Sequence, residues 1–376
     1  MRITNNTVAA IAKKYGTPLY IYDAAMIVQK CRELKKAVPS VGWYYACKAN
    51  TNAEVMKLIA REGYGIETVS PGEIAAARAA KVPVSKITFT CSSIDEAELV
   101  AVVKQGIRVH LDSLRQVEIV GKHFPGSKVS VRLNQGIGAG HHSHVITGGP
   151  DSKFGIDVRQ IAELSRLGKK YRLRVTGLHQ HIGSNILDGA MVMKAMNALF
   201  ETAMLFPELE HLDFGGGLGV PYRPDEKKLD VIALGKKIAR SSEIFFKNYA
   251  RRVAMSFEPG RYLVAEAGVL AVKVNDVKRN PTKTFVGVNS GFNHLIRPAM
   301  YGSYHEIVNA TRPRGVREKV TIAGNICESG DVFAKDRMIA SPKIGDILII
   351  KNAGAYGYTM SSDYNLRPKP REVVIK

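Results

Sequence analysis

The stretch YYACKAN (residues 44–50) places a lysine directly after a run of aromatic and small residues that is typical of a β-strand. The run VGWYYA (41–46) predicts a buried strand, and Lys48 follows at its carboxyl end. A lysine ordinarily keeps its charge in water, on a polar helix face or in a loop. Because side chains alternate along a strand, we expect Lys48 to point into the mouth at the strand end and Cys47 toward a covering helix layer.

Runs of the same kind recur along the first two thirds of the chain, and helix-like stretches such as NAEVMKLIAREG (52–63) and SPGEIAAARAAK (70–81) separate them. A third such stretch, SIDEAELVAVVKQG (93–106), opens with a capping-box pattern, Ser93 with Glu96 three residues on. Eight strands that are each followed by a helix predict a (β/α)8 barrel of the TIM type, within the α/β class. The eight predicted strands are 41–46, 65–69, 86–91, 107–112, 128–133, 174–179, 210–214 and 253–258.

The pattern changes near residue 265, where strand-like runs follow one another without long helices between them. These runs are GVLAVKVNDV (268–277), KTFVGVN (283–289), KVTIAG (319–324) and IGDILIIK (344–351). They predict a separate C-terminal β-rich domain, a sandwich or a barrel. We therefore expect a barrel over residues 24–264 and a β-rich domain built from residues 1–23 and 265–376.

The composition is that of a soluble globular protein, with 376 residues, 45% apolar and 23% charged. No stretch approaches the roughly 18 uncharged apolar residues of a membrane helix. The N-terminal MRITNNTVAAIAKKYG has no apolar core of a secretory signal. The four cysteines form no CxxC pair, which favours a reducing compartment and predicts a cytoplasmic protein.

The chain is strongly basic, with 54 Lys and Arg against 34 Asp and Glu and a formal charge of +20. This charge raises the alternative of a nucleic-acid partner. The basic residues are scattered, however, and the densest patches, RPRGVREK (312–319) and RPKPREVVIK (367–376), contain no interleaved aromatic residues. Attraction of small anionic molecules, or solubility alone, explains the charge equally well, so a nucleic-acid partner is not expected. A binding titration with salt would decide between them.

Polar residues gather where the barrel strands are predicted to end. His179 and His181 close the sixth strand, GGGLG (215–219) follows the seventh, and EPGR (258–261) closes the eighth. GGGLGV lacks the third glycine of a dinucleotide fingerprint. Glycines at this place in a barrel commonly bind a phosphate, and Arg261 would add a charge-assisted contact. A tight turn without a ligand is the alternative.

A lysine at the barrel mouth, a phosphate site, a carboxylate (Glu258) and a nearby histidine are what pyridoxal 5′-phosphate requires. Its aldehyde bonds covalently to a lysine, and a carboxylate beside the pyridine nitrogen keeps that nitrogen protonated. The combination predicts this cofactor, with Lys48 as its attachment point. The alternative is a lysine whose stem is buried while its ammonium reaches solvent from the strand end.

The same residues, with further blocks, resemble the alanine-racemase-like barrel decarboxylases that use pyridoxal phosphate (fold type III), and within them the diaminopimelate decarboxylase family. The resemblance runs from YGTPLYIYD (15–23) to LRPKPREVVI (366–375), nearly the whole chain. Besides YYACKAN, its most specific blocks are GGPDSKFGI (148–156), GLHQHIGSN (177–185), LDFGGGLGVPY (212–222), EPGRYLVAEAG (258–268), IRPAMYGSYHEI (296–307), CESGDVFAKDR (327–337) and GAYGYTMSSDYNLRPKP (354–370).

The resemblance implies a role for each site residue. Lys48, His181 and Cys327 would be catalytic; His181 would stack on the cofactor ring, and Cys327 would reach across a homodimer interface to protonate the decarboxylated carbon. The cofactor would be held by Lys48, His181, Ser184, Gly217, Glu258, Gly260, Arg261 and Tyr356. The substrate would be held by Arg261, Arg297, Tyr301, Glu328 and Tyr356, with Glu328 on the distal ammonium and Arg297 on the distal carboxylate.

The resemblance also implies the reaction, which is decarboxylation of meso-2,6-diaminopimelate to L-lysine and CO2 in lysine biosynthesis. The sequence departs from the family at Asn289 and Ser290, where members usually carry an aspartate, and at TCSSIDEAEL (90–99). A related decarboxylase of another diamino acid, such as D-lysine, D-ornithine or a substrate of a specialised pathway, is therefore the second hypothesis.

Two further alternatives concern other classes of protein. The motifs GHHSH (140–144) and HQH (179–181) suggest a metal hydrolase, but in barrel hydrolases the HxH motif belongs to the first strand, where this chain has Lys48. We therefore expect no metal. A relative without turnover would be expected to lack Lys48 or Cys327, and both residues are present.

Overall fold

The computed structural model describes residues 3–140, 148–149 and 152–376. Residues 141–144 of the GHHSH motif, and with them its candidate metal site, lie outside the described residues. The chain divides into two compact units. The barrel unit comprises residues 30–219 and 228–260, and the β-rich unit comprises residues 1–29, 220–227 and 261–376.

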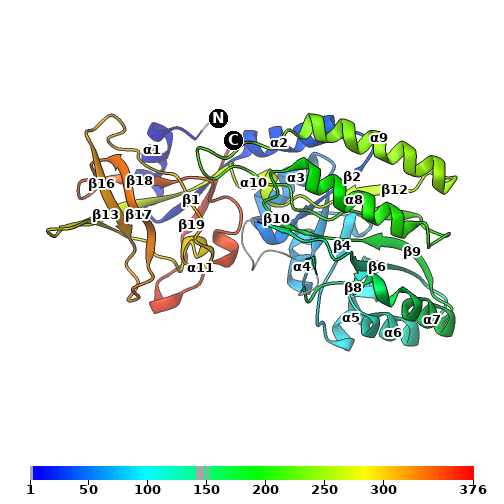
Figure 1. Cartoon of the computed structure of the whole chain (residues 1–376). Coiled ribbons are helices and arrows are strands. Elements are labelled where there is room, and N and C mark those ends of the chain that lie inside the picture. The colour runs from blue at the N-terminus through cyan, green and yellow to red at the C-terminus, as the bar shows by residue number, and fades with distance from the viewer. Residues whose placement is uncertain (1–2, 141–147, 150–151) are drawn as a thin grey trace. The chain divides into compact units, whose positions relative to one another are not determined.

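The barrel unit contains a closed cylinder of eight parallel strands, which confirms the predicted (β/α)8 barrel (Figure 1). Each strand pairs with its neighbour in the ring, and the last strand closes against the first through Ser256–Gly42 and Phe257–Trp43. The strands in ring order are β2 (Gly42–Ala46), β3 (Gly65–Thr68), β4 (Ile87–Phe89), β5 (Arg108–Leu111), β6 (Lys128–Asn134), β9 (Arg174–His179), β11 (His211–Asp213) and β12 (Ala254–Phe257).

Short strands extend the ring at its carboxyl edge. β8 (Ile156–Asp157) continues the sheet beside β6, and β7 (Ala139–Gly140) pairs in parallel with β10 (Gly183–Ser184). These additions lie in the loops that follow β6 and β9. In a barrel of this type such loops build the functional site.

Helices alternate with the strands, and capping residues in the sequence set their first turns. The helices are α2 (Ala24–Ala37), α3 (Ala53–Arg61), α4 (Pro71–Ala79), α5 (Glu96–Lys104), α6 (Leu114–His123), α7 (Ile161–Tyr171), α8 (Gly189–Ala203) and α9 (Val231–Tyr249), and the 3₁₀ turns are η1 (Cys47–Ala49), η2 (Val84–Lys86) and η4 (Val158–Gln160). The oxygens of Asn52 and Ser70 accept backbone N–H groups at the starts of α3 and α4. Side chains of this type satisfy amide groups that have no partner within the helix.

The predicted capping box at Ser93 is wrong. α5 begins at Glu96, and its N-cap is Asp95, whose side chain accepts the backbone N–H of Ala97. Ser93 has φ +54°, a left-handed conformation, and therefore belongs to the preceding turn. Asp95 lay within the motif and is an equally good cap by residue type.

The β-rich unit contains one sheet of eight strands, with both parallel and antiparallel pairs (Figure 1). The strands are β1 (Leu19–Asp23), β13 (Gly268–Arg279), β14 (Thr284–Val288), β15 (Ile307–Asn309), β16 (Arg317–Ala323), β17 (Val332–Ala340), β18 (Ile347–Ile350) and β19 (Arg371–Ile375), and the helices are α1 (Asn5–Tyr15), α10 (Arg261–Val264), α11 (Arg297–Tyr301) and the 3₁₀ turns η5 (Tyr358–Met360) and η6 (Tyr364–Leu366). β13 is long enough to pair with β1 and β18 over its first half and with β14 over its second.

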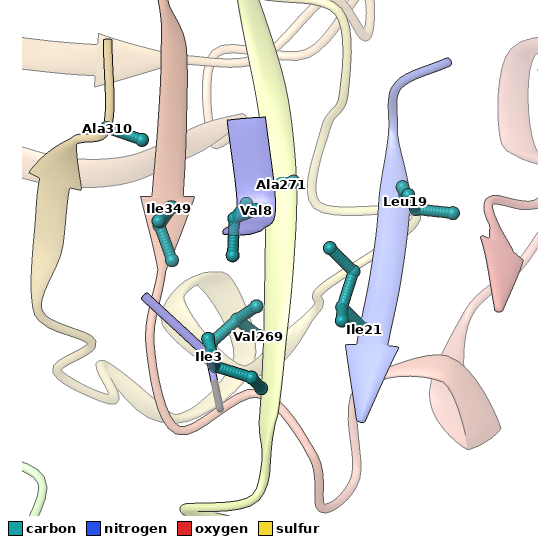
Figure 2. Close-up of a cluster of buried hydrophobic side chains, with 8 residues drawn as sticks. All are labelled: Ile3, Val8, Leu19, Ile21, Val269, Ala271, Ala310 and Ile349. Carbon is teal, nitrogen blue, oxygen red and sulfur yellow. The ribbon is translucent and has the colours of Figure 1, made fainter. Parts of the chain in front are cut away.

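Segments from both ends of the chain join this sheet. β1 runs antiparallel to β13 and parallel to β19, so the first and last strands of the chain are neighbours. Apolar side chains of β1 form one buried cluster with residues of α1, β13 and β18 (Figure 2), and the partly buried Val373 and Ile375 of β19 pack against it. The cluster consists of Ile3, Val8, Leu19, Ile21, Val269, Ala271, Ala310 and Ile349. Burial of apolar side chains such as these is the main contribution to the stability of the sheet.

No helix within residues 3–140, 148–149 and 152–376 combines the length and the apolar character needed to cross a membrane.

Candidate active site

The predicted site residues fall into two groups, one in each unit. Lys48, His181, Ser184, Gly217, Glu258 and Gly260 belong to the barrel unit, and Arg261, Arg297, Tyr301, Cys327, Glu328 and Tyr356 belong to the β-rich unit. The chain passes from the first group to the second between Gly260 and Arg261. The geometry of each group is therefore described separately.

Lys48 lies in the 3₁₀ turn η1, directly after β2, and the strand does not extend to it. The prediction that strand alternation aims its side chain is therefore wrong, although Cys47 is buried as expected. The Nζ atom of Lys48 lies 3.2 Å from Oε2 of Glu67, whose side chain at the middle of β3 is almost fully buried. This ion pair holds the amine at the carboxyl end of the barrel, where it remains partly exposed.

Glu67 was missed by the sequence reasoning. A carboxylate in the middle of the apolar run GIETV (65–69) was the available signal, because a buried charge requires a partner. Nearby Cys47 is not a reactive thiol, since burial first, and Glu73 and Glu67 next, raise its pKa well above the ordinary value. Glu67 is thus paired with the Lys48 amine, and the neighbouring Cys47 thiol stays uncharged.

His181 is fixed by the glycine loop after β11. The backbone N–H of Gly216 donates to Nδ1 of His181 at 3.1 Å, so the ring proton lies on Nε2. Burial, followed by the charge of Lys48, lowers the pKa of His181 well below its ordinary value. His181 is therefore a neutral imidazole whose flat ring is oriented by the loop.

The loop needs glycine because its backbone touches other backbone segments. Gly215 has φ +65°, and a Cβ there would lie 2.3 Å from the carbonyl oxygen of Gln180. A Cβ on Gly216 would lie 2.4 Å from the carbonyl oxygen of Glu258. A side chain at either position would collide with the neighbouring backbone, and this close packing holds the carboxyl ends of β9, β11 and β12 together.

Glu258 follows β12 and is buried. Its Oε2 atom lies 3.1 Å from Nε2 of His179, while its Oε1 atom is buried without a hydrogen-bond partner among the described residues. Burial first, then the nearby carboxylates of Asp213 and Glu67, raises the pKa of Glu258 well above its ordinary value. An acceptor oxygen left without a donor in a buried site fits a ligand that brings an N–H group.

Two further glycines offer backbone donors. Gly217 has φ +105°, and neither its N–H nor that of Gly260 donates a hydrogen bond within the described part of the chain. A Cβ on Gly217 would lie 2.8 Å from the carbonyl oxygen of Gly183, next to Ser184 on β10. Free N–H groups of this kind are suited to phosphate oxygens.

In the β-rich unit, two buried arginines converge on one tyrosine. Nη1 of Arg261 donates to the hydroxyl of Tyr222 at 2.8 Å, and the guanidinium of Arg297 lies 4.4 Å from the centre of the same ring. Burial raises the pKa of Tyr222, but the two guanidinium charges outweigh it and bring that pKa below the ordinary value. Arg261 also lies 4.8 Å above the ring of Tyr356.

Arg297 is the largest side chain that is completely buried in the described chain, and no carboxylate lies within ion-pair distance of it there. Its Nη1 donates to Nε2 of His305 at 3.0 Å, and His305 in turn donates from Nδ1 to the carbonyl oxygen of Lys351 at 2.7 Å. Burial, with Arg297 next, lowers the pKa of His305 to about 3, so this partner is neutral. A buried guanidinium with neutral partners fits an anionic ligand.

The remaining predicted residues lie on the surface of the β-rich unit or near it. Cys327 and Glu328 are exposed in the single chain, and the backbone N–H of Cys327 donates to Oδ1 of Asn365 at 2.8 Å. Tyr301 ends α11, and Tyr356 takes a left-handed backbone with φ +56°. Sequence reasoning missed Tyr222 and His305, although both lie in the blocks LDFGGGLGVPY and IRPAMYGSYHEI.

The HQH motif does not bring its two histidines to one point. His179 contacts Glu258, whereas His181 is bound by Gly216. Sequence reasoning considered His179 only as part of a metal motif and did not connect it with Glu258, which is 79 residues away in the chain.

Comparison with known proteins identifies the family. Residues 24–265 match the family model described as pyridoxal-dependent decarboxylase, pyridoxal binding domain. The chain is similar to the diaminopimelate decarboxylase of Methanothermobacter thermautotrophicus, with 43% identity over 97% of this chain and 88% of that protein. It is 34% identical to the diaminopimelate decarboxylase of Escherichia coli K12 over 99% of this chain and 92% of that protein.

Solved structures give the same result. A crystal structure of diaminopimelate decarboxylase superposes with a TM-score of 0.92 at 34% identity, covering 99% of this chain and 91% of the other. The Helicobacter pylori enzyme, complexed with L-lysine, gives 0.90 at 30% identity over 98% of this chain and 94% of the other. Since relatives above 30% identity span nearly the whole chain, this chain belongs to the diaminopimelate decarboxylase family of pyridoxal-dependent decarboxylases.

Proposed function

We propose that the protein is a pyridoxal-phosphate-dependent carboxy-lyase that converts meso-2,6-diaminopimelate to L-lysine and CO2, the reaction of lysine biosynthesis. The observation that carries the proposal is that the barrel unit presents both Lys48, at the end of β2, and Glu258, after β12. Lys48 supplies an amine beside Glu67, and Glu258 supplies a buried oxygen, Oε1, to which no group of the described chain donates a hydrogen bond. The family to which the chain belongs supports the same reaction.

The residues of the barrel unit fit pyridoxal phosphate. Lys48 would bond to its aldehyde, Oε1 of Glu258 would accept its ring N–H, and the N–H groups of Gly217 and Gly260, with Ser184, would bind its phosphate. From the β-rich unit, Arg261 and Tyr356 are proposed to add a charge and a hydroxyl. When bound, the cofactor supplies an electron sink for the carbanion that remains after CO2 leaves.

His181 is proposed to lie against the face of the cofactor ring. Its neutral state suits this role, because an imidazolium would repel a protonated ring. The Gly216 N–H fixes the plane of the imidazole before the cofactor binds. His181 therefore contributes a rigid, uncharged contact surface.

The choice of substrate is argued from Arg297 and Arg261. Both are buried, both contact Tyr222, and within the described chain Arg297 forms no ion pair with a carboxylate. A distal carboxylate of the substrate would give Arg297 a bidentate partner, whereas lysine and ornithine would leave it unpaired. Tyr301 and Tyr356 are proposed to complete the contact. The unusual Asn289 and Ser290 bond to Thr17, Lys273 and His294 and are not hydrogen-bonded to Arg297.

Cys327 and Glu328 are proposed to act in the site of a second copy. Both side chains are exposed in the single chain, and adjacent positions suit a pair that reaches one substrate. Cys327 would protonate the carbon that loses CO2, and Glu328 would bind the distal ammonium. The protein would then be a homodimer with shared active sites.

Three expectations remain part of the proposal. The division into a cofactor-binding barrel of residues 24–264 and a β-rich domain of residues 1–23 and 265–376 is supported by the family match over 24–265. A cytoplasmic location is supported by four free cysteines. No nucleic-acid partner is proposed, because the basic charge suits anionic substrates as well.

Covalent mapping of the cofactor tests the proposal. The purified holoprotein should absorb visible light, and borohydride should remove that absorption and leave a pyridoxyl group on Lys48. Lys48→Ala should lose the adduct and nearly all turnover. Lys86→Ala is the matched control, because this lysine lies on the 3₁₀ turn η2 before β4 and should leave the adduct unchanged. A pyridoxyl group on another lysine would contradict the assignment.

A further inference from the structure

A chain of buried polar side chains crosses the barrel interior beneath Glu258, and the proposed function uses none of them. Its members come from β5, β6, β9, β11 and β12 and are His110, Ser130, His179, His211, Asp213 and Ser256. The interior of such a barrel is ordinarily filled by branched apolar side chains. Polar groups in that place require hydrogen bonds and indicate a purpose beyond packing.

His179 is the member that reaches Glu258. Its Nε2 lies 3.1 Å from Oε2 of Glu258, within hydrogen-bond distance. One ring nitrogen of His179 and one carboxyl oxygen each of Glu258 and Asp213 lie within 4.8 Å of one another. His179 therefore has two carboxyl groups close to it.

Asp213 is built as a permanent carboxylate. Its Oδ1 accepts the backbone N–H of Gly215 at 2.8 Å, and its Oδ2 accepts the hydroxyl of Ser256 in a short hydrogen bond. Nε2 of His211 lies 3.7 Å from Oδ2 of Asp213. Burial opposes the charge, but the hydrogen bond with His211 first, and then the nearby imidazoles of His179 and His110, hold the pKa of Asp213 below its ordinary value.

We propose that His179 is a positioning residue that takes up the proton of Glu258 and so keeps Glu258 a carboxylate facing the ring nitrogen of bound pyridoxal phosphate. The inference rests on the proposed function. The proton moves along the existing hydrogen bond: the Oε2–H bond of Glu258 breaks and the Nε2–H bond of His179 forms. No oxidant, reductant or leaving group takes part, and a carboxyl oxygen of Asp213 lies within 4.8 Å of a ring nitrogen of His179.

The proton transfer produces the charged form of Glu258, which burial alone disfavours. Burial raises the pKa of Glu258 and lowers the pKa of His179, so each group alone is neutral. Transfer within the hydrogen bond leaves the net charge of the pair unchanged. Asp213 stabilises the imidazolium, and a donor at Oε1, the oxygen without a partner, stabilises the carboxylate.

Other charged and titratable groups around His179 and Glu258 also affect the charged forms of these two side chains. Arg132, His110 and His181 face His179 and oppose an imidazolium, while Lys48 and Glu67 face Glu258 with opposite effects. The charge of Arg132 is offset by Asp112, with Nη1 and Oδ1 3.6 Å apart. Asp112 is therefore already paired with Arg132. Within the described chain, Asp213 is left as the carboxylate that can stabilise a charged His179.

Nitrogen NMR of the holoenzyme, loaded with pyridoxal phosphate that carries ¹⁵N in its ring, tests the proposal directly. The ring signal separates protonated from unprotonated nitrogen and does not depend on turnover. In the wild type the nitrogen should stay protonated from pH 6 to 9. The His179→Gln variant keeps an amide near the position of Nε2 but cannot carry a positive charge. In this variant the ring nitrogen of the cofactor should lose its proton between pH 6 and 9.

Turnover gives a second readout. His179→Gln should lower kcat about 10²-fold while KM changes little, because substrate contacts are intact. Asp213→Asn should shift the ring signal in the same direction, which keeps the test available if one variant folds poorly. His110→Gln is the matched control: its ring centre lies 4.6 Å from that of His179, with the ring planes tilted by 31°, but in the described chain it does not bond to Glu258, so the ring signal should match the wild type.

The outcomes separate the two proposals. A ring nitrogen that stays protonated from pH 6 to 9 in both His179→Gln and Asp213→Asn would overturn the role of His179 and leave the proposed function intact. A wild-type protein that does not bind the cofactor on Lys48 would overturn the proposed function, and this inference with it.

Discussion

Arg297 is the residue on which the choice of substrate depends most. It is completely buried, it stacks on Tyr222, and its Nη1 atom donates to His305, which is neutral. Leaving a buried charge without a counter-ion is costly, so a site of this kind rejects ligands that lack the complementary group. Asn289 and Ser290, which depart from the family pattern, hydrogen-bond to Thr17 and His294.

Replacement of Arg297 should therefore act on specificity. Arg297→Ala should lower kcat/KM for meso-diaminopimelate by roughly 10³-fold or more and change kcat/KM for D-lysine, which lacks the distal carboxylate, much less. The absorption of the bound cofactor should persist. Arg337→Ala is the matched control, since Arg337 also stacks on a tyrosine, Tyr304, at 3.5 Å. Equal losses for both substrates would contradict a role in carboxylate recognition.

At the scale of single elements, the sequence predicted the strands well. All eight predicted barrel strands exist, and 174–179 has the predicted bounds, because apolar runs between helical segments are strong local signals. Details that depend on non-local contacts could not be predicted. The 3₁₀ turn at Lys48, the ion pair with Glu67 and the pairing of His179 with Glu258 join residues that only the closed barrel brings together.

The helix cap at α5 was decided by local backbone geometry rather than by residue type. Asp95→Ala should cost about 1 kcal/mol of unfolding free energy, because it removes the oxygen that accepts the Ala97 N–H. Ser93→Ala should change the stability by less than about 0.5 kcal/mol, since Ser93 is exposed and outside the helix. Urea denaturation measures both. A larger cost for Ser93→Ala than for Asp95→Ala would support the capping box that the sequence favoured.

At the scale of the whole molecule, buried histidines make the stability sensitive to acid. Burial lowers the pKa of His110 and His305 to about 3, compared with about 6.5 in an unfolded chain. Below pH 6.5 the unfolded chain takes up protons that the folded chain excludes. The stabilisation is therefore complete above pH 6.5 and is lost as the pH falls toward 3.

Each of these histidines should remove about 2 kcal/mol of unfolding free energy between pH 6.5 and 5. Denaturation at pH 7.5, 6 and 5 measures the slope, and His110→Gln should make it shallower than in the wild type. A stability that does not change between pH 7.5 and 5 would show that these imidazoles are protonated in the folded state.

Assembly is the second property of the whole molecule that can be tested. Lys48→Ala and Cys327→Ala chains should each be inactive, and mixing them should restore activity if the two residues act in one shared site. With random exchange, half of the dimers are hybrid and one of their two sites is intact, so about a quarter of wild-type activity is expected. If no activity returns although subunit exchange is verified by mass spectrometry, each site is built within one chain.

The proposed decarboxylation of meso-diaminopimelate can be measured against the alternatives by assaying four substrates separately. The holoprotein is offered meso-diaminopimelate, L-lysine, D-lysine and D-ornithine in turn, and the released CO2 and the amine product are quantified together. We expect equal amounts of CO2 and L-lysine from meso-diaminopimelate. The value of kcat/KM for this substrate should be at least about 10³-fold above that for the other three substrates. Faster release of CO2 from D-lysine, D-ornithine or L-lysine would contradict the claim.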